Sequence, residues 1–106
     1  MSEHSKLVGK SLQFLNSRPN CFAFPVDPGL HGLKGTHDII ACFWGSFISF
    51  EVKVGNDTLK PHQRRFGRKV AKAMGKAREI RSFESLKEYI FSLESGLNTL
   101  ETKYPR

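Results

Sequence analysis

Two neighbouring segments constrain the fold of this chain more than any other feature. Residues 36–44 and 47–54 are rich in apolar, β-branched and aromatic residues, and Gly45-Ser46 separates them. A two-residue connection that begins with glycine is typical of a type II′ turn, so the pattern predicts an antiparallel hairpin. Side chains alternate between the faces of a sheet, and one hairpin face is therefore wholly apolar and must meet a layer of helices. The residues of that face are Ile39, Ala41, Phe43, Ile48, Phe50, Val52 and Val54.

The opposite face of the hairpin is apolar near the turn and charged at its far end. The predicted turn places Ile40 opposite Glu51 and Asp38 opposite Lys53. Asp38 and Glu51 are then diagonal neighbours, with Cβ atoms roughly 7 Å apart. Two carboxylates at that separation can share a divalent cation, and the ammonium group of Lys53 would partly neutralise them. The alternative is a plain surface ion pair between Asp38 and Lys53, with Glu51 solvated.

The rest of the chain alternates between helical and extended patterns. We predict a helix over 3–16 that Ser2 caps, a strand over 21–26, a glycine-rich loop over 27–35, a helix from Pro61 to about Met74 with Gly75 as its C-cap, a strand over 77–81 and a last helix that Ser82 caps. The resulting order, αβββαβα, indicates one α/β domain over residues 1–106.

Charge and composition narrow the possible partners. The net charge of +7 favours a polyanion, either nucleic acid or an anionic membrane surface. No apolar run approaches the roughly 20 residues that span a bilayer, and the N-terminus lacks the pattern of a signal peptide, so we expect a cytoplasmic location. Cys21 and Cys42 lie among apolar residues without a zinc-binding spacing, and we expect two reduced, buried thiols.

The helix that follows Pro61 is basic on one side and apolar on the other. The segment 58–78 contains eight basic residues and no acidic one. Like charges on one helix repel each other, and a phosphate backbone would relieve that repulsion, although a basic face can also serve solubility alone. Gln63 falls on the apolar side, where its amide needs a partner at the charged end of the hairpin or in the first turn of its own helix. The predicted nucleic-acid contacts are Lys34, Lys60, Arg64, Arg65, Arg68, Lys69 and Lys72.

Three motifs taken together resemble the PD-(D/E)XK nuclease superfamily. They are Gly35-Thr36-His37-Asp38, then Glu51-Val52-Lys53, then Gln63 at the start of a helix. Within the superfamily, the chain is most similar to the virus-type replication-repair nuclease domain, VRR-NUC. The resemblance implies a restriction-endonuclease-like αβββαβα core with a mixed sheet flanked by helices. The chain departs from the family pattern at His37, where a proline usually precedes the aspartate.

The resemblance also implies roles for individual residues. Asp38, Glu51 and the backbone carbonyl of Val52 would bind Mg²⁺ or Mn²⁺, and Glu3 of the first helix is a further candidate ligand. Lys53 would orient the attacking water and stabilise charge on the scissile phosphate. Gln63 would support the site from the helix.

These implications lead to one expected function and two alternatives. We expect a metal-dependent DNA endonuclease that hydrolyses phosphodiester bonds in Holliday junctions or other branched DNA as a homodimer. We expect the protein in the cytoplasm, which includes the cytoplasm of a virus-infected host cell. We expect it to need neither a membrane nor a small-molecule cofactor. The alternatives are a catalytically inactive nuclease-fold module that only binds nucleic acid, and a basic scaffold protein that binds RNA.

Overall fold

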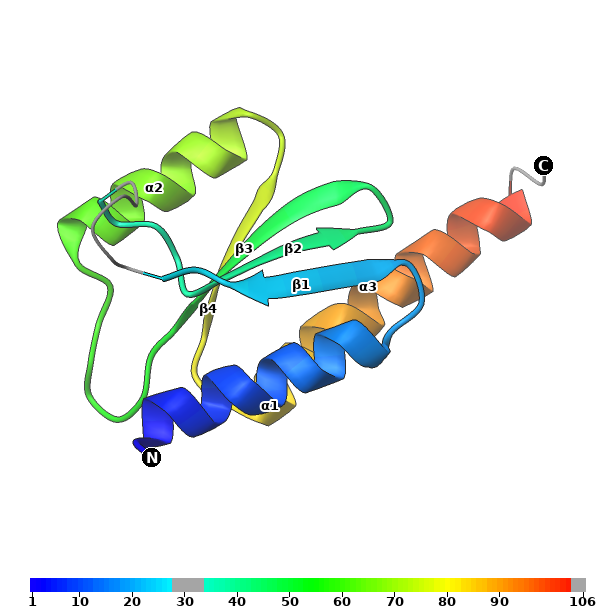
Figure 1. Ribbon diagram of the computed structural model, residues 1–106. Helices are drawn as coiled ribbons and strands as arrows, with labels where there is room; N and C mark the ends of the chain where they lie inside the picture. The colour runs from blue at the N-terminus through cyan, green and yellow to red at the C-terminus, as the bar shows by residue number, and fades with distance from the viewer. Residues whose placement is uncertain (28–33, 104–106) are drawn as a thin grey trace.

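A four-stranded sheet with helices on both faces forms the protein (Figure 1). This computed structural model describes residues 1–27 and 34–103, with side chains described up to residue 97, so most of the predicted loop lies outside the described residues. The elements follow the predicted order and confirm the α/β class. They are α1 (Glu3–Ser17), β1 (Cys21–Pro25), β2 (Ile39–Phe43), β3 (Ser46–Val52), α2 (Pro61–Lys72), β4 (Lys76–Ile80) and α3 (Phe83–Lys103).

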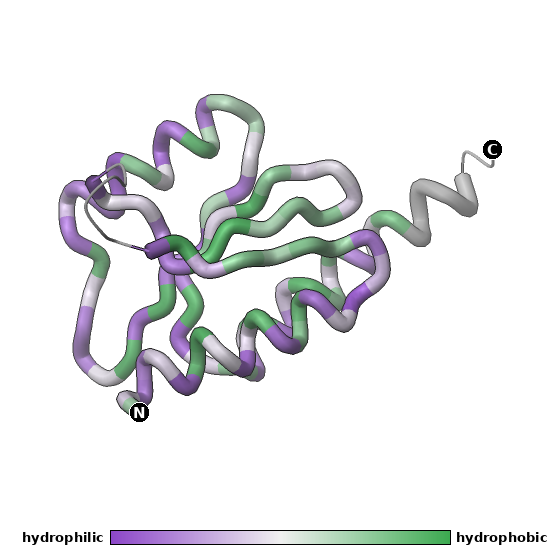
Figure 2. Tube along the Cα trace, viewed as in Figure 1, coloured by the Kyte–Doolittle hydropathy of each residue, from purple (hydrophilic) through white to green (hydrophobic). Residues whose placement is uncertain are grey.

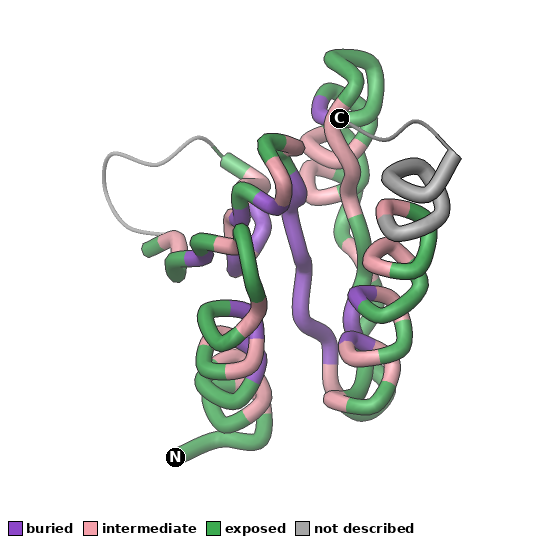
Figure 3. The backbone as a smooth tube through the Cα atoms, turned by 90° about the vertical axis from the view of Figure 1, so that its right-hand side faces the viewer, coloured by how far each residue is buried: buried purple, intermediate pink, exposed green. Residues whose placement is uncertain are grey.

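The sheet is mixed, as the resemblance implied. Its strand order is β1-β2-β3-β4, with antiparallel pairs β1–β2 and β2–β3 and a parallel pair β3–β4. Helices α1 and α3 cover one face, whereas α2 lies on the other face over β3 and β4 (Figures 1 and 3). Among the described residues, no helix is both long enough and apolar enough to cross a membrane.

The core lies between the sheet and the pair α1 and α3. The predicted apolar hairpin face is buried there, apart from Val54, which is half-buried. Full burial of one such aliphatic or aromatic side chain contributes roughly 1.5–3 kcal/mol. In Figure 2, the strands of the sheet carry much of the hydrophobic colour of the chain. The helices supply Leu15, Leu86 and Ile90, all of which are fully buried.

The hairpin turn differs from the prediction. Phe43 pairs with Ser46, and the two turn residues are Trp44 and Gly45, which have φ values of +50° and +82°. Two positive φ values define a type I′ turn instead of type II′. The backbone N–H of Trp44 also donates to the carbonyl of Asn20 at 2.8 Å, so Trp44 is held by the residue just before β1. The register therefore shifts by two residues, and an even shift leaves every side chain on its predicted face.

The helix ends follow the predicted caps with one exception. Ser2 and Ser82 each accept a hydrogen bond from a backbone N–H three residues later, both at 3.1 Å. The left-handed residue after α2 is Met74, with φ +73°, and not Gly75. Gly75 instead donates its N–H to the carbonyl of Val70 at 2.9 Å and sits where a Cβ would meet Val70 at 2.9 Å. Close packing, not a positive φ, thus explains the glycine.

Candidate active site

The charged end of the hairpin is the starting point of the site. Ile39 pairs with Phe50, and extending this register by one residue places Asp38 opposite Glu51. The predicted diagonal pair is therefore a direct pair, and the predicted partner of Asp38, Lys53, lies just past the end of β3. The three side chains remain on one face of the sheet because the shift in register is even.

Asp38 is held by two other segments of the chain. Its Oδ2 accepts a hydrogen bond from the backbone N–H of Val52 at 2.8 Å and lies 3.1 Å from Nε2 of His4 in α1. Its backbone carbonyl accepts from the N–H of Val26 at 2.8 Å. The carboxylate is therefore fixed between α1, the end of β1 and the end of β3, and its Oδ1 lies outside these contacts.

Glu51 is the most unusual residue of the site. Its side chain is 4% exposed, Oε2 lies 3.3 Å from Nζ of Lys53, and Oε1 is buried without a hydrogen-bond partner among the described residues. Burial, together with the nearby charge of Asp38, raises the pKa of Glu51 to about 7, although Lys53 opposes this shift. A buried carboxylate oxygen without a partner is unfavourable unless a further ligand is present.

Lys53 places a buried cation beside these carboxylates. Its side chain is 5% exposed, and Nζ lies 3.5 Å from Oδ2 of Asp57 as well as 3.3 Å from Glu51. The Lys53 ammonium also lowers the pKa of Asp57. An unpaired buried ammonium is costly, and the carboxylates of Glu51 and Asp57 offset that cost for Lys53.

His37 connects the sheet to α2. Its imidazole is buried, with Nδ1 2.9 Å from Oγ of Ser49 in β3 and Nε2 2.9 Å from the carbonyl of Gln63 in α2. A carbonyl can only accept, so Nε2 carries the proton and Nδ1 of the neutral ring accepts from the Ser49 hydroxyl. Burial lowers the pKa of His37, which favours this neutral form. The ring also packs on Phe66 at 4.8 Å between centroids.

Two glycines allow α2 to approach this part of the sheet. Gly35 has φ +87°, and a Cβ there would lie 2.3 Å from the carbonyl oxygen of His62. A Cβ on Gly67 would lie 3.4 Å from the His37 ring. The first turn of α2 consequently sits directly above the charged end of the hairpin.

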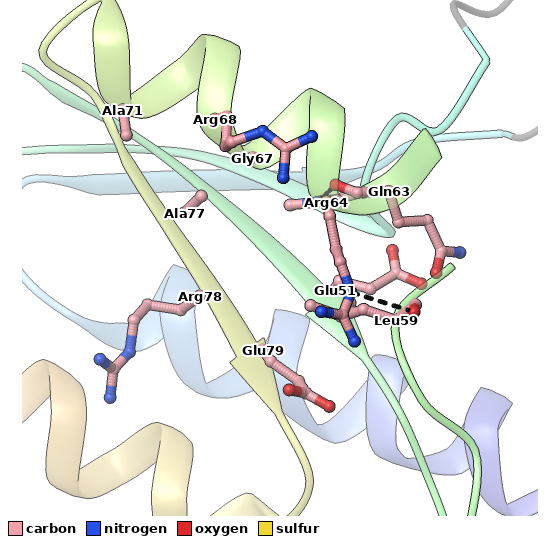
Figure 4. A pocket seen from close by; sticks show the side chains of 11 residues that line it. Glu51, Leu59, Gln63, Arg64, Gly67, Arg68, Ala71, Ala77, Arg78 and Glu79 are labelled. Carbon is pink, nitrogen blue, oxygen red and sulfur yellow. Dashed lines mark hydrogen bonds between the residues drawn. The ribbon is translucent and has the colours of Figure 1, made fainter. Parts of the chain in front are cut away.

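A cleft of about 300 Å³ separates α2 from β4 beside Glu51 (Figure 4). Figure 4 shows Glu51, Gln63 and Arg64 close together at one end, with Arg68 and Glu79 along the sides. Gln63 and Glu51 line the same cleft, and the hydrogen bond of the Gln63 side chain follows the second of the two predicted alternatives, a partner in the first turn of its own helix. Its Oε1 accepts from the backbone N–H of Lys60 at 2.9 Å, so it also serves the first turn of its own helix.

The structure adds two residues that sequence reasoning missed. Glu79 pairs with Glu51 in the parallel β3–β4 register and lines the same cleft, although Arg81 engages its carboxylate at 2.6 Å. His4 contacts Asp38 from α1, the helix where Glu3 was the candidate ligand. Glu3 lines a different hollow with Lys6 and Lys10, and neither Asp38 nor Glu51 lines that hollow. The helical rotation of one residue separates these two positions.

The predicted DNA-contacting residues fall on several surfaces. Arg64 and Arg68 line the cleft beside Glu51. Lys34, Arg65 and Lys69 line a second hollow of about 350 Å³ on the other flank of α2. Lys60 and Lys72 are exposed and line neither hollow. Among the described residues, no carboxylate forms an ion pair with any of these seven side chains.

The donor atoms at the site fit a hard divalent cation. No group of three or more His, Cys, Asp or Glu side chains within the described part of the chain could hold a metal ion. Asp38 and Glu51 nevertheless supply two carboxylates, one with a buried oxygen that has no hydrogen-bond partner in the described ranges. Mg²⁺ commonly binds one or two carboxylates and keeps its remaining positions for water and phosphate oxygens. The oxygen donors therefore fit Mg²⁺ or Mn²⁺ better than zinc.

Comparison with known proteins identifies the fold. No model of a known family and no curated protein matches the chain. A solved structure described as a VRR_NUC domain superposes with a TM-score of 0.72 and 17% sequence identity, over 85% of this chain and 96% of that chain. The chain has the VRR_NUC fold. This result confirms the fold that the resemblance implied.

Proposed function

We propose that this VRR_NUC-fold protein is a metal-dependent DNA endonuclease that hydrolyses phosphodiester bonds. The single observation that carries the proposal is the buried pair of Glu51 and Lys53, because Glu51 also lines a cleft together with Arg64 and Arg68. Burial raises the pKa of Glu51 to about 7, and one of its carboxylate oxygens lacks a hydrogen-bond partner among the described residues. Such a group does not favour folding, and groups with strongly shifted pKa values concentrate at functional sites. The fold likeness adds the nuclease class.

The residues divide the chemical work between them. Asp38 and Glu51 would hold Mg²⁺ or Mn²⁺ with the backbone carbonyl of Val52, and the cation would stabilise charge on phosphate oxygens as a Lewis acid. Lys53 would orient the attacking water and stabilise negative charge on the scissile phosphate. Gln63 would support the site from the first turn of α2. We propose no role as a ligand for Glu3, since His4 occupies the position beside Asp38.

The basic surface supports DNA as the substrate. Arg64 and Arg68 line the cleft that holds Glu51, where they would bind the phosphates on either side of the scissile bond. Among the described residues, no carboxylate forms an ion pair with either arginine, so a bound phosphate backbone would lower the electrostatic energy of α2.

We extend the proposal to branched DNA, a homodimer and a cytoplasmic site of action. A Holliday junction is resolved by two cuts related by two-fold symmetry, which two copies of one active site would deliver. The single domain predicted over residues 1–106 carries one candidate site, so two copies would supply the two cuts.

A cleavage assay tests the proposed activity. Four-way junction, flap and blunt duplex DNA should be incubated with wild-type protein in Mg²⁺, in Mn²⁺ and in EDTA. Cleavage should require a divalent cation, and Glu51→Gln should lower its rate at least about 100-fold. Glu84→Gln, which removes an exposed carboxylate of α3, is the matched control and should cut like the wild type.

A direct binding measurement separates the alternatives. Calorimetric titration of Mn²⁺ should show one binding event in the wild type that Glu51→Gln weakens. Cleavage by Glu51→Gln at the wild-type rate would overturn the assignment of the site. DNA binding without cleavage by any cation would instead define a nuclease-fold nucleic-acid-binding module.

A further inference from the structure

Exposed aromatic rings lie on the open half of the sheet. The side chains of Phe22, Phe24 and Phe47 are 65%, 42% and 45% exposed, and we call these three residues the aromatic strip. Phe22 and Phe47 both pair with Cys42, so they share the sheet face that carries Glu51. Helix α2 covers β3 and β4 on that face and leaves β1 and β2 open (Figure 1). This opening also explains why Cys42 is exposed, contrary to the expected buried thiol.

A basic surface borders the strip. Lys34, His62, Arg65 and Lys69, which we call the basic flank, line the second hollow together with Phe66. The ring of Phe66 packs on His37, the residue just before Asp38 and close to the start of β2, so the flank faces the β1–β2 half of the sheet. No carboxylate lines this hollow, and no ion pair reaches the flank within the described part of the chain.

The strip begins close to the candidate active site. Phe24 pairs with Ile40, which lies two residues beyond Asp38 on the same sheet face. Two residues along a strand span roughly 7 Å. Successive nucleotides of one stacked strand rise by about 3.4 Å. A base one to three nucleotides from a phosphate that a cation places beside Asp38 and Glu51 would therefore reach the ring of Phe24.

The charge around the strip argues against a second copy of the chain as its occupant. Two copies packed face to face through these rings would bring two basic flanks together, on proteins that each carry a net charge of +7. Extension of the sheet at β1 is also blocked at Ala23, because the side-chain amide of Asn16 binds both its N–H and its carbonyl, at 2.8 and 2.9 Å. A partner that combines negative charge with flat aromatic surfaces fits better.

We propose that the aromatic strip stacks with unpaired bases of the DNA substrate while the basic flank binds the backbone of the same strand. Aromatic rings beside a basic groove form the common design of single-strand binding surfaces. Bases inside a duplex present no free face, so among branched DNAs this surface would favour flaps and other forms with unpaired nucleotides next to the scissile bond over a fully paired four-way junction. The inference rests on the proposed nuclease function and names the structural feature that its substrate would carry.

Binding measured without catalysis tests this surface. Fluorescence anisotropy in EDTA should compare a single-stranded oligonucleotide, a flap duplex and a blunt duplex. The double variant Phe22→Leu, Phe24→Leu keeps apolar surface but removes two aromatic faces. It should weaken binding of single-stranded and flap DNA by about 5-fold to 100-fold and leave the blunt duplex within about twofold. Phe91→Leu in α3, a residue that is also 45% exposed, is the matched control and should bind all three like the wild type.

A fluorescent base reports the contact itself. An oligonucleotide with 2-aminopurine among its unpaired bases should change emission on binding to the wild type and to Phe91→Leu, but less with the double variant. Circular dichroism melting checks the fold, and the single variant Phe22→Leu at the most exposed ring replaces the double variant if the latter unfolds.

Three outcomes distinguish the possible failures. Unchanged binding of single-stranded DNA by a folded Leu variant overturns the inference. A second set of results would also overturn the inference. Sedimentation would show that the wild type is a dimer and that the Phe22→Ala, Phe24→Ala variant is a monomer with normal DNA binding, because a second copy of the chain would then cover the strip. Binding of single-stranded DNA through the strip, without cleavage in the presence of any cation, supports the inference and contradicts only the nuclease proposal.

Discussion

Glu51→Gln should make the protein more stable at alkaline pH while it abolishes activity. The substitution keeps the shape of the side chain and removes a carboxylate that is 4% exposed. One oxygen of this carboxylate has no hydrogen-bond partner within 1–27 and 34–97. Burial holds the pKa of Glu51 at about 7 in the folded protein, against an ordinary value of 4.5. The folded state therefore keeps a proton that the unfolded chain releases, and the stability that this proton confers is present below pH 4.5 and is lost as pH rises through 7.

The size of the effect follows from that interval. A span from 4.5 to about 7 corresponds to about 3 kcal/mol of unfolding free energy, which wild type should lose over this pH range and Glu51→Gln should keep. The net gain at pH 8 should be smaller, about 1–2 kcal/mol, because Lys53 stays buried and retains only Asp57 at 3.5 Å. Saturating Mn²⁺ should restore wild-type stability by about 2.7 kcal/mol at 100 times its dissociation constant, with little effect on the variant.

Urea unfolding at a series of pH values measures this prediction. The free energy of unfolding should fall more steeply between pH 5 and 8 for wild type than for Glu51→Gln. Glu79→Gln, on the next strand, keeps Glu51 and should follow the wild-type pH dependence. Parallel curves for wild type and Glu51→Gln would show that Glu51 is not an unfavourably buried carboxylate, and they would refute the reasoning from burial.

Three further substitutions test how the chain builds the site. His37→Ala should lower the free energy of unfolding, measured in urea, by about 2–4 kcal/mol. The substitution removes two buried hydrogen bonds and the contact with the Phe66 ring. A loss below about 1 kcal/mol would contradict the role of His37 in connecting the sheet to α2. Met74→Gly should raise the melting temperature and stabilise by about 0.5–1 kcal/mol, since glycine adopts φ +73° without strain; destabilisation would refute this. Asn16→Ala should cost about 1–3 kcal/mol and speed amide exchange at Ala23, and an unchanged exchange rate there would count against sealing of the β1 edge.

The local pattern of the sequence determined the elements and the faces of the sheet. Alternation with period two set Asp38, Glu51 and Lys53 on one side of the hairpin, and this assignment survived a two-residue error in register because side-chain direction depends only on parity. The serine caps, Ser2 and Ser82, also follow from local hydrogen bonds within one helical turn. The fold class could be read from the order of these elements, since each amphipathic element has few ways to bury its apolar side.

Only the tertiary structure decided which distant residues meet at the site. The contact of His4 with Asp38 depends on how α1 lies across the sheet, and the pairing of Glu79 with Glu51 depends on the register of a parallel crossover. Neither leaves a periodic signal in the sequence, because both join segments separated by many residues. The pKa of Glu51 likewise arises from burial beneath α2, a property of the packed molecule that a local motif does not contain.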